Sequence, residues 1–133
     1  GVKPCAIATS IHLIIAQRLA RRLCEQCKEL RDIPEEALLL EGFTRDDIHG
    51  NLRIFGPVGC KQCNDGYKGR VGIYQVMPVT EAIGRIILAG GNAVQIEEQS
   101  VKDGVWTLRR SALHKVKMGV TSLEEINRVT LES

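Results

Sequence analysis

Two pairs of cysteines constrain the fold of this 133-residue chain more than any other feature of its sequence. Each pair has the spacing C-x2-C, one at Cys24 and Cys27 and the other at Cys60 and Cys63, with residues 28–59 between them. A C-x2-C knuckle can place two sulfurs on one side of a tight turn, and two knuckles can supply the four thiolates of a structural zinc site. The long separation is no obstacle, because loop-closure entropy grows only logarithmically with length. The sequence therefore predicts a structural Zn²⁺ site with these four ligands.

Other interpretations of the cysteines stay open at this point. They could form two redox pairs or be unrelated buried side chains. Two knuckles with a long separation are more typical of a zinc site. The same pattern favours zinc over an iron–sulfur cluster. Four thiolates would leave no coordination position for water, so the expected role is structural. The fifth cysteine, Cys5, is expected to be a small buried hydrophobe. An odd number of cysteines without a recognisable signal peptide favours a reducing compartment.

The composition is that of an ordinary globular domain with an aliphatic core. Hydrophobic residues make up 44% and aromatic residues 4%, and 18 basic residues nearly balance 16 acidic ones, for a net charge of +2. This balance argues against a polybasic nucleic-acid binder. The longest apolar stretch, residues 11–16, is far shorter than the ~20 residues of a transmembrane helix. The chain has no initiator methionine, so we expect it to be part of a longer protein.

Apolar spacing predicts an amphipathic helix over residues 11–23. Its apolar stripe recurs every four positions, at Ile11, Ile15, Leu19 and Leu23. On such a helix Arg18, Arg21 and Arg22 would project together from the polar side, where their like charges repel. These arginines are a possible interface with an acidic neighbour, and a solvated face without a partner is the alternative.

Short elements are expected between the cysteine pairs and directly after them. A helix is predicted over residues 35–41, and Thr44 can cap a second turn of helix. Alternating apolar and polar residues predict a short strand over residues 52–55. A nearly continuous apolar run predicts a strand over residues 71–79 that is buried on both faces.

Capping signals predict helices through the C-terminal part of the chain. The expected helices span residues 81–89, 93–102, 107–118 and about 122–129. Thr80 and Asn92 are the expected caps of the first two, and Thr121 forms a capping box with Glu124 for the last. Together with the short strands, these helices predict an α+β fold that is mostly helical.

No residue is predicted to be catalytic or to bind a nucleotide cofactor. The chain contains no G-x-x-x-x-G-K-[ST] phosphate loop, and Gly56–Lys61 does not match that spacing. It also lacks the H-E-x-x-H and G-x-S-x-G motifs. His12, His49 and His114 have no partners at metal-ligand spacing, and structural or solvated roles are expected for them.

A zinc-ribbon module that binds nucleic acid or protein is the alternative function, and a stand-alone zinc scaffold is a third. A nucleic-acid module would be expected to have more positive charge, with aromatic residues near the knuckles. The residues between the cysteine pairs are instead net acidic, because acidic residues outnumber Arg31, Arg45 and Arg53 there. We therefore expect no nucleic-acid partner.

Four segments resemble the traffic ATPases that assemble type IV pili and the E-protein ATPases of type II secretion. These segments are residues 13–24 (LIIAQRLARRLC), 59–63, 66–74 (GYKGRVGIY) and 119–130. The resemblance covers the whole chain. It departs from the family at Gln75, where Glu is usual, at Cys5, where an aromatic residue is usual, and at Arg110-Ser111, where an acidic pair is common.

The resemblance implies that the chain is the C-terminal piece of a RecA-like traffic ATPase with a tetracysteine zinc-binding insertion. It implies that residues 1–23 end the RecA-like domain and that residues 24–63 form the insertion. Residues 64–79 would then be a turn and a returning core strand, and residues 80–133 a helical subdomain.

The resemblance also implies the activity and the partners. The family's phosphate loop and acidic metal-binding motifs lie upstream, so ATP and Mg²⁺ are expected only in the full-length parent, and this region alone is expected to be inactive. The parent would be a cytoplasmic homohexamer without a transmembrane segment. It would associate peripherally with the inner membrane through the platform protein of a pilus or secretion machine. The expected role of this region is structural and coupling, in either pilus assembly or type II secretion.

Overall fold

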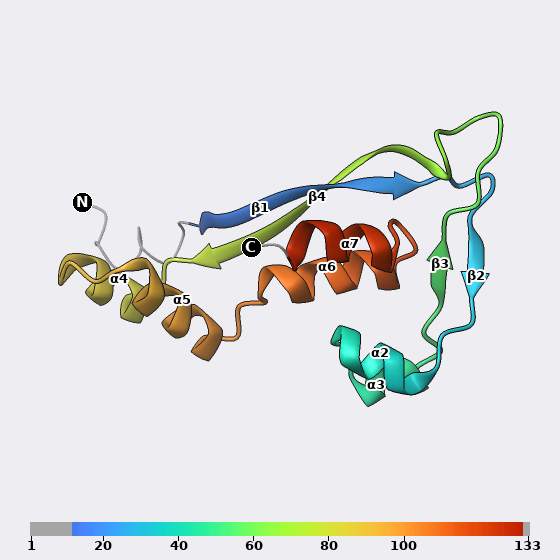
Figure 1. The fold of residues 1–133 in the computed structure, drawn as a ribbon. Helices are drawn as coiled ribbons and strands as arrows, with labels where there is room; N and C mark the ends of the chain where they lie inside the picture. The colour runs from blue at the N-terminus through green and yellow to red at the C-terminus, as the bar shows by residue number, and fades with distance from the viewer. Residues whose placement is uncertain (1–11, 132–133) are drawn as a thin grey trace. The chain divides into compact units, whose positions relative to one another are not determined.

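The computed structural model describes residues 12–131, which form six helices and four strands (Figure 1). These residues divide into two compact units. The first unit contains residues 12–17 and 74–107, and the second contains residues 18–73 and 108–131. The combination of helices with short strands confirms the α+β class. Within the described residues, no helix has both the length and the apolar character that crossing a membrane requires.

The predicted helix over residues 11–23 is wrong, because β1 (His12–Leu23) is a strand. It pairs with β4 (Tyr67–Pro78) in a two-stranded sheet, and the two strands run in opposite directions (Figure 1). Leu19, in the stripe that was expected to be buried, is 51% exposed, whereas Ala20, outside that stripe, is 1% exposed. A four-residue recurrence of apolar residues does not exclude a strand, and pairing with β4 overrides the helical periodicity here.

β4 alternates between buried and exposed side chains, which corrects the prediction that both of its faces are buried. Met77 is fully buried, while Tyr74 and Val76 are each 44% exposed. Gln75 lies among the buried residues, and its Nε2 has no hydrogen-bond partner among the described residues. The strand predicted over residues 71–79 therefore coincides with most of β4, but the strand is longer and only half-buried.

β2 (Glu29–Arg31) and β3 (Ile54–Gly56) form a second, antiparallel sheet. Leu30 lies opposite Phe55 in its register. β3 overlaps the strand predicted over residues 52–55, whereas the three residues of β2 carry no pattern that predicted a strand.

α2 (Glu35–Glu41) and α3 (Arg45–His49) connect β2 to β3 and confirm the two helices expected there. Thr44 caps α3 through a reciprocal pair of hydrogen bonds. Its Oγ1 accepts from the Asp47 N–H at 3.1 Å, and Asp47 Oδ2 accepts from the Thr44 N–H at 3.1 Å. Gly42 ends α2 at a φ of 120°, in the left-handed region that favours glycine.

α4 (Glu81–Leu88) and α5 (Ala93–Lys102) belong to the first unit and confirm two more predicted helices with their caps. Thr80 Oγ1 accepts a hydrogen bond from the Ile83 N–H at 3.2 Å. Asn92 Oδ1 accepts one from the Gln95 N–H at 2.9 Å. The buried core of this unit consists of Met77, Val79 and Ile83.

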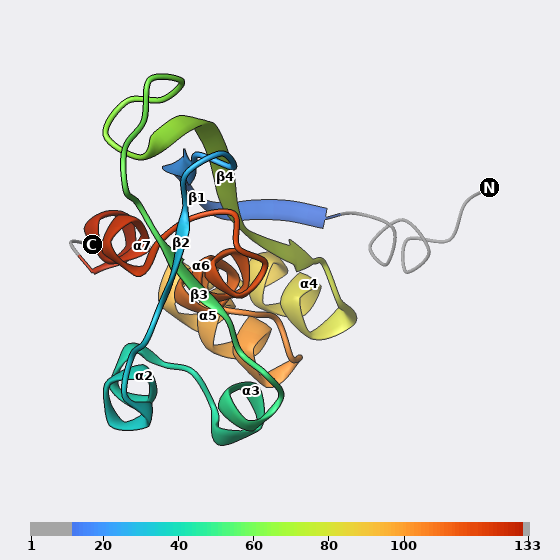
Figure 2. The ribbon, with the colours of Figure 1, turned by 90° about the vertical axis from the view of Figure 1, so that its right-hand side faces the viewer.

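α6 (Leu108–Lys117) and α7 (Leu123–Thr130) belong to the second unit, where they pack against each other and α6 also lies beside β3 (Figure 2). The core of this unit draws on all of its parts. Its buried members are Ala20, Leu38, Phe43, Ile54, Ile73, Ala112, Leu113, Val116, Leu123 and Ile126. Folding of the second unit therefore depends on contacts between segments that are distant in the sequence.

α7 begins one residue later than predicted. Ser122, rather than Thr121, is its N-cap, and the Ser122 Oγ accepts a hydrogen bond from the Glu125 N–H at 3.1 Å. The hydroxyl of Thr121 instead donates to the Arg21 carbonyl at 2.8 Å. The capping signal located the start of the helix correctly to within one residue.

Glu125 is a buried acid, 1% exposed, that joins α7 to β1. Its carboxylate accepts hydrogen bonds from the Arg21 N–H at 2.7 Å and the Arg21 Nη2 at 2.8 Å, and from the Nε and Nη2 of Arg128, both at 2.9 Å. Burial raises the pKa of this carboxyl, but the hydrogen bonds from Arg128 and Arg21 outweigh burial and lower the pKa to about 2. The carboxylate is therefore charged at neutral pH.

The three arginines of β1 do not form the single polar side that a helix would present. Successive residues of a strand point to opposite faces, so Arg21 is on the other face from Arg18 and Arg22. The acidic neighbour of Arg21 is Glu125 of the same chain.

Replacing Glu125 with Gln should lower stability at neutral pH and weaken its dependence on pH. A carboxyl whose pKa falls from 4.5 to about 2 on folding contributes roughly 3 kcal/mol. Because the pKa of the folded state is the lower one, this contribution is complete above about pH 4.5 and is lost as the pH falls toward 2.

The measurement is urea unfolding of wild type and Glu125→Gln across this pH range, with a chelator present so that metal binding contributes to neither protein. We expect a wild-type advantage of roughly 3 kcal/mol at neutral pH that disappears in acid. A difference that stays constant from neutral pH to pH 2 would contradict the assigned role of the charge.

Candidate metal centre

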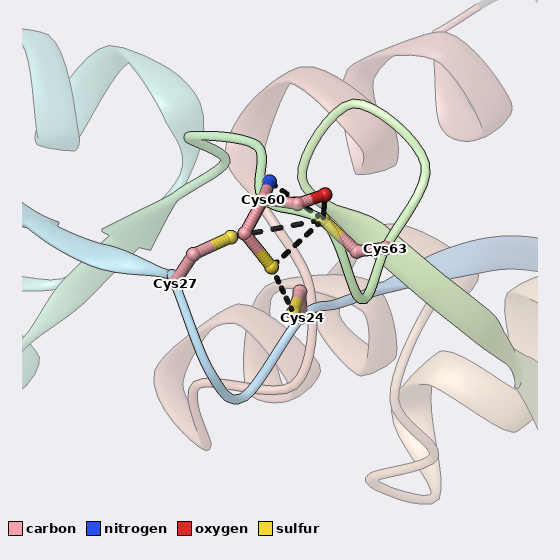
Figure 3. A group of neighbouring side chains, drawn as sticks. All are labelled: Cys24, Cys27, Cys60 and Cys63. Carbon is pink, nitrogen blue, oxygen red and sulfur yellow. Dashed lines mark hydrogen bonds between the residues drawn. The ribbon is translucent and has the colours of Figure 1, made fainter.

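The four predicted ligand cysteines converge on one point of the second unit (Figure 3). Their four Sγ atoms all lie within 4.8 Å of one another. The Sγ–Sγ distance is 3.8 Å from Cys24 to Cys60, 3.8 Å from Cys27 to Cys63, and 3.6 Å from Cys60 to Cys63. Zinc–sulfur bonds of about 2.3 Å place thiolates at tetrahedral corners about 3.8 Å apart. The arrangement therefore fits a tetrahedral metal ion with four sulfur ligands.

The first knuckle is the turn between β1 and β2. Cys24 follows directly after β1 and is 1% exposed. Its N–H donates to the Gly66 carbonyl at 2.9 Å, and its carbonyl accepts from the Lys28 N–H at 3.0 Å. The first of these bonds ties the knuckle to the loop that carries the other two cysteines, and the second closes the turn around Cys27.

The second knuckle lies in the loop between β3 and β4. The Cys63 N–H donates to the Cys60 carbonyl at 3.4 Å, which closes the turn. Two further backbone groups point at sulfur: the Cys60 N–H donates to Cys63 Sγ at 3.2 Å, and the Gly59 N–H donates to Cys27 Sγ at 3.3 Å. Such N–H donors stabilise thiolates and orient them as ligands.

The pKa values of the Cys24 and Cys60 thiols are shifted in opposite directions. Burial raises the pKa of the Cys24 thiol, but hydrogen bonds from the Gln26 and Cys27 N–H groups and from Cys60 lower it overall to about 7. The Gln62 N–H lowers the pKa of the Cys60 thiol, but burial and the neighbouring cysteine sulfurs raise it overall to about 11. Closely spaced thiolates repel one another, and a cation among them would allow all four to ionise together.

The basic side chains beside the knuckle interact with other groups. Lys28 donates to the Gly119 carbonyl at 2.9 Å and to Glu25 at 3.2 Å, with its Nζ 4.6 Å from the centroid of the Phe55 ring. Arg21 pairs with Glu125. Lys28 thus connects the knuckle to the segment that follows α6.

The other residues singled out in the sequence do not join the cysteines. His12 begins β1, His49 ends α3 with its Nε2 3.4 Å from Glu35, and His114 is in α6. Cys5 lies outside the described residues. Within residues 12–131, the four cysteines are the only group of His, Cys, Asp or Glu side chains placed to hold a metal ion.

Two residues that matter to the site were not among the predicted site residues. Gly66 could have been found, because Asn64-Asp65-Gly66 is a recognisable turn sequence. Glu125 could not, because its partner Arg21 is 104 positions away in the chain.

The comparisons with known proteins agree with the geometry. A family model described as "Type II/IV secretion system protein" matches residues 1–128. The type IV pilus assembly ATPase PilB of Pseudomonas aeruginosa is 54% identical over 130 residues, which is 98% of this chain and 23% of that protein. PilB of Acinetobacter baylyi is 56% identical over 99% of this chain and 23% of its own length.

A secretion protein is also similar to the chain. The type II secretion system protein E of Aeromonas hydrophila is 37% identical over 99% of this chain and 26% of its own length. The chain therefore spans about a quarter of the length of the curated relatives that it matches.

Replacing Gly66 with Ala should distort the site. Gly66 is buried with a φ of 96°, and an added Cβ would overlap the Cβ of Pro57 and lie 2.9 Å from the Val58 nitrogen. We expect a loss of about 1–3 kcal/mol in stability together with weaker metal retention, because the carbonyl of Gly66 holds Cys24.

Gly84→Ala is the matched control, since nothing lies within 4 Å of the Cβ that it would add to α4. It should leave metal binding unchanged and raise stability by up to about 1 kcal/mol, the helix preference of Ala over Gly. Thermal unfolding and metal analysis of both variants are the measurements. Equal behaviour of the two variants would rule out the steric argument.

Proposed function

The chain belongs to the type II/IV secretion system protein family, and from this premise we propose that it is the zinc-stabilised C-terminal region of a hexameric traffic ATPase. Its role is structural and coupling: it supports assembly and transmits movement, while ATP and Mg²⁺ bind elsewhere in the full-length protein. The observation that carries this proposal is the convergence of the four cysteine sulfurs.

Zinc is the metal that this donor set favours. Four thiolates within 4.8 Å of one another, three pairs of them at 3.6 to 3.8 Å, suit a tetrahedral d¹⁰ cation with soft ligands. Cys24, Cys27, Cys60 and Cys63 would fill its coordination shell. The ion would therefore supply a cross-link between the β1–β2 turn and the β3–β4 loop rather than a Lewis acid for chemistry.

The cross-link has a clear structural purpose. Residues 28–59 add α2, α3 and the β2–β3 sheet to the second unit but contribute few buried residues, among them Leu38, Phe43 and Ile54. A segment with so little core of its own gains stability when its two ends are held together. The metal would hold those ends.

The coupling role is supported by the course of the two long strands. β1 contributes residues 12–17 to the first unit and residues 18–23 to the second. β4 contributes residues 67–73 to the second unit and residues 74–78 to the first. Both strands thus belong to both units, and two of the three places where the backbone passes from one unit to the other lie within them.

Of the two systems, the proposal takes type IV pilus assembly. Two pilus ATPases are 54% and 56% identical to the chain, against 37% for one secretion protein, although a further pilus ATPase is 38% identical. The proposed partners are further copies of the same protein in the hexamer and the inner-membrane platform protein of the pilus machine. The proposed location is the cytoplasmic side of the inner membrane.

The purified chain should bind one zinc ion, and Cys60→Ser should lose it. Removing one of four thiolates opens the coordination shell and weakens a structural zinc site strongly. Elemental analysis after dialysis measures the stoichiometry, with Ser111→Ala as a control far from the cysteines in sequence. Undiminished zinc in Cys60→Ser would exclude this ligand set.

Arg18 and Arg22 remain a proposed interface, and both lie on the face of β1 opposite Arg21. The test is a chimera in which this chain replaces the matching segment of the Pseudomonas aeruginosa pilus ATPase. We expect the chimera to assemble pili, and the double variant Arg18→Glu, Arg22→Glu to lose assembly and ATP turnover while retaining zinc.

The control for charge is Arg45→Glu with Arg53→Glu, which makes the same change at two exposed positions between the cysteine pairs. It should leave assembly intact. If the two double variants assemble pili equally well, Arg18 and Arg22 have no interface role.

A further inference from the structure

The residues that lead into the first ligand are held by one short segment. The Arg21 N–H donates to Glu125 Oε2 at 2.7 Å, and the Arg21 carbonyl accepts from the Thr121 hydroxyl at 2.8 Å. The Leu23 N–H donates to the Val120 carbonyl at 2.8 Å. We call residues 119–125, between the end of α6 and the first turn of α7, the α7 clamp.

The α7 clamp also holds the residue that follows the first knuckle. Lys28 comes directly after Cys27, and its Nζ donates to the carbonyl of Gly119 at 2.9 Å. Its side chain is only 16% exposed and lies over Phe55. The first knuckle is therefore bounded on both sides by residues bonded to the clamp.

The second knuckle is connected to the same clamp through Tyr67. This residue begins β4, shortly after Cys63, and its hydroxyl lies 2.7 Å from the Oγ of Ser122. The guanidinium of Arg21 stacks over the Tyr67 ring at 4.2 Å from its centroid. Tyr67 and Ser122 are both buried, so this contact is shielded from water.

Glu125 is the centre of this network. It is 1% exposed, and each of its carboxylate oxygens accepts from both Arg21 and Arg128. Losing any of these donors leaves the buried charge less well compensated, which makes the carboxylate sensitive to the position of β1. Glu125 touches none of the four cysteines, so any effect on them passes through Arg21.

We propose that Glu125 is a positioning residue for the metal centre, and that metal binding and the docking of α7 stabilise each other. The proposal rests on the metal site of the proposed function. The coupling is reciprocal. If docking of α7 raises the metal affinity by some factor, metal binding raises the equilibrium constant for docking of α7 by the same factor. Partners that orient metal ligands from outside the coordination shell are worth about 10- to 100-fold in affinity.

The test compares Glu125→Gln with a matched control, Glu41→Gln. Glu41 in α2 also pairs with an arginine, Arg109 of α6, at the same 2.8 Å. Arg109 is itself bonded to Asn127 and Thr130 of α7, but Glu41→Gln removes neither of these bonds and changes no residue of the clamp. Zinc affinity of the purified chain is measured by competition with a chromophoric chelator. We expect about a 10-fold or greater loss in Glu125→Gln and less than about a 3-fold loss in Glu41→Gln.

A second measurement reports on the coupling itself. Hydrogen exchange of the α7 amides, residues 123–130, is followed with and without zinc. In the wild type, zinc should slow this exchange by about 10-fold or more, the factor by which docking of α7 is expected to raise zinc affinity. In Glu125→Gln, most of this slowing should be lost. Arg21→Gln is the alternative variant if Glu125→Gln does not fold, because Arg21 is 49% exposed and its loss leaves Glu125 paired with Arg128.

The outcomes separate this inference from the proposed function. Equal losses of zinc affinity in Glu125→Gln and Glu41→Gln would show general destabilisation and overturn the positioning role. Wild-type affinity and wild-type zinc-dependent protection in Glu125→Gln or Arg21→Gln would overturn it as well, while leaving the metal site standing. A wild-type chain that binds no zinc would overturn both.

Discussion

Mutual repulsion among four closely spaced thiolates is the constraint on which the second unit depends. Thiolates within 4.8 Å of one another repel, so the four sulfurs cannot all carry charge without a cation beside them. A divalent cation would remove this repulsion and favour the same close approach. That approach brings together the β1–β2 turn and the β3–β4 loop, which are the two ends of the segment that carries α2 and α3.

A second kind of interaction complements the metal site. The cysteine cluster joins two turns, whereas Glu125 joins a helix to a strand through directional hydrogen bonds to a carboxylate that is 1% exposed. Neither interaction can replace the hydrophobic core, which takes buried residues from β1, α2, β3, β4, α6 and α7. The two polar sites instead specify which of the possible packings of these elements is adopted.

Local signals in the sequence predicted local structure well. The caps at Thr44, Thr80 and Asn92 located their helices because a side chain and an amide three residues later are sufficient to start a helix. The cysteine cluster was predictable for a similar reason, since ligand type and spacing describe it fully. The sequence predicted a helix for β1 because the pairing with β4, which makes it a strand, is not a local signal. The Arg21–Glu125 pair could not be predicted, because it forms only when the whole unit folds.

The position of the cysteines at the base of the α2–α3 segment has a consequence for evolution. Because both ends of residues 28–59 meet at the ligands, the chain between them can grow or shrink without moving a sulfur, and doubling its length costs only about 0.6 kcal/mol in closure entropy. A substitution at an exposed position such as Leu40, which is 89% exposed, should therefore leave the cysteine cluster unchanged. The surface of this segment can therefore change while the cysteine cluster keeps its geometry.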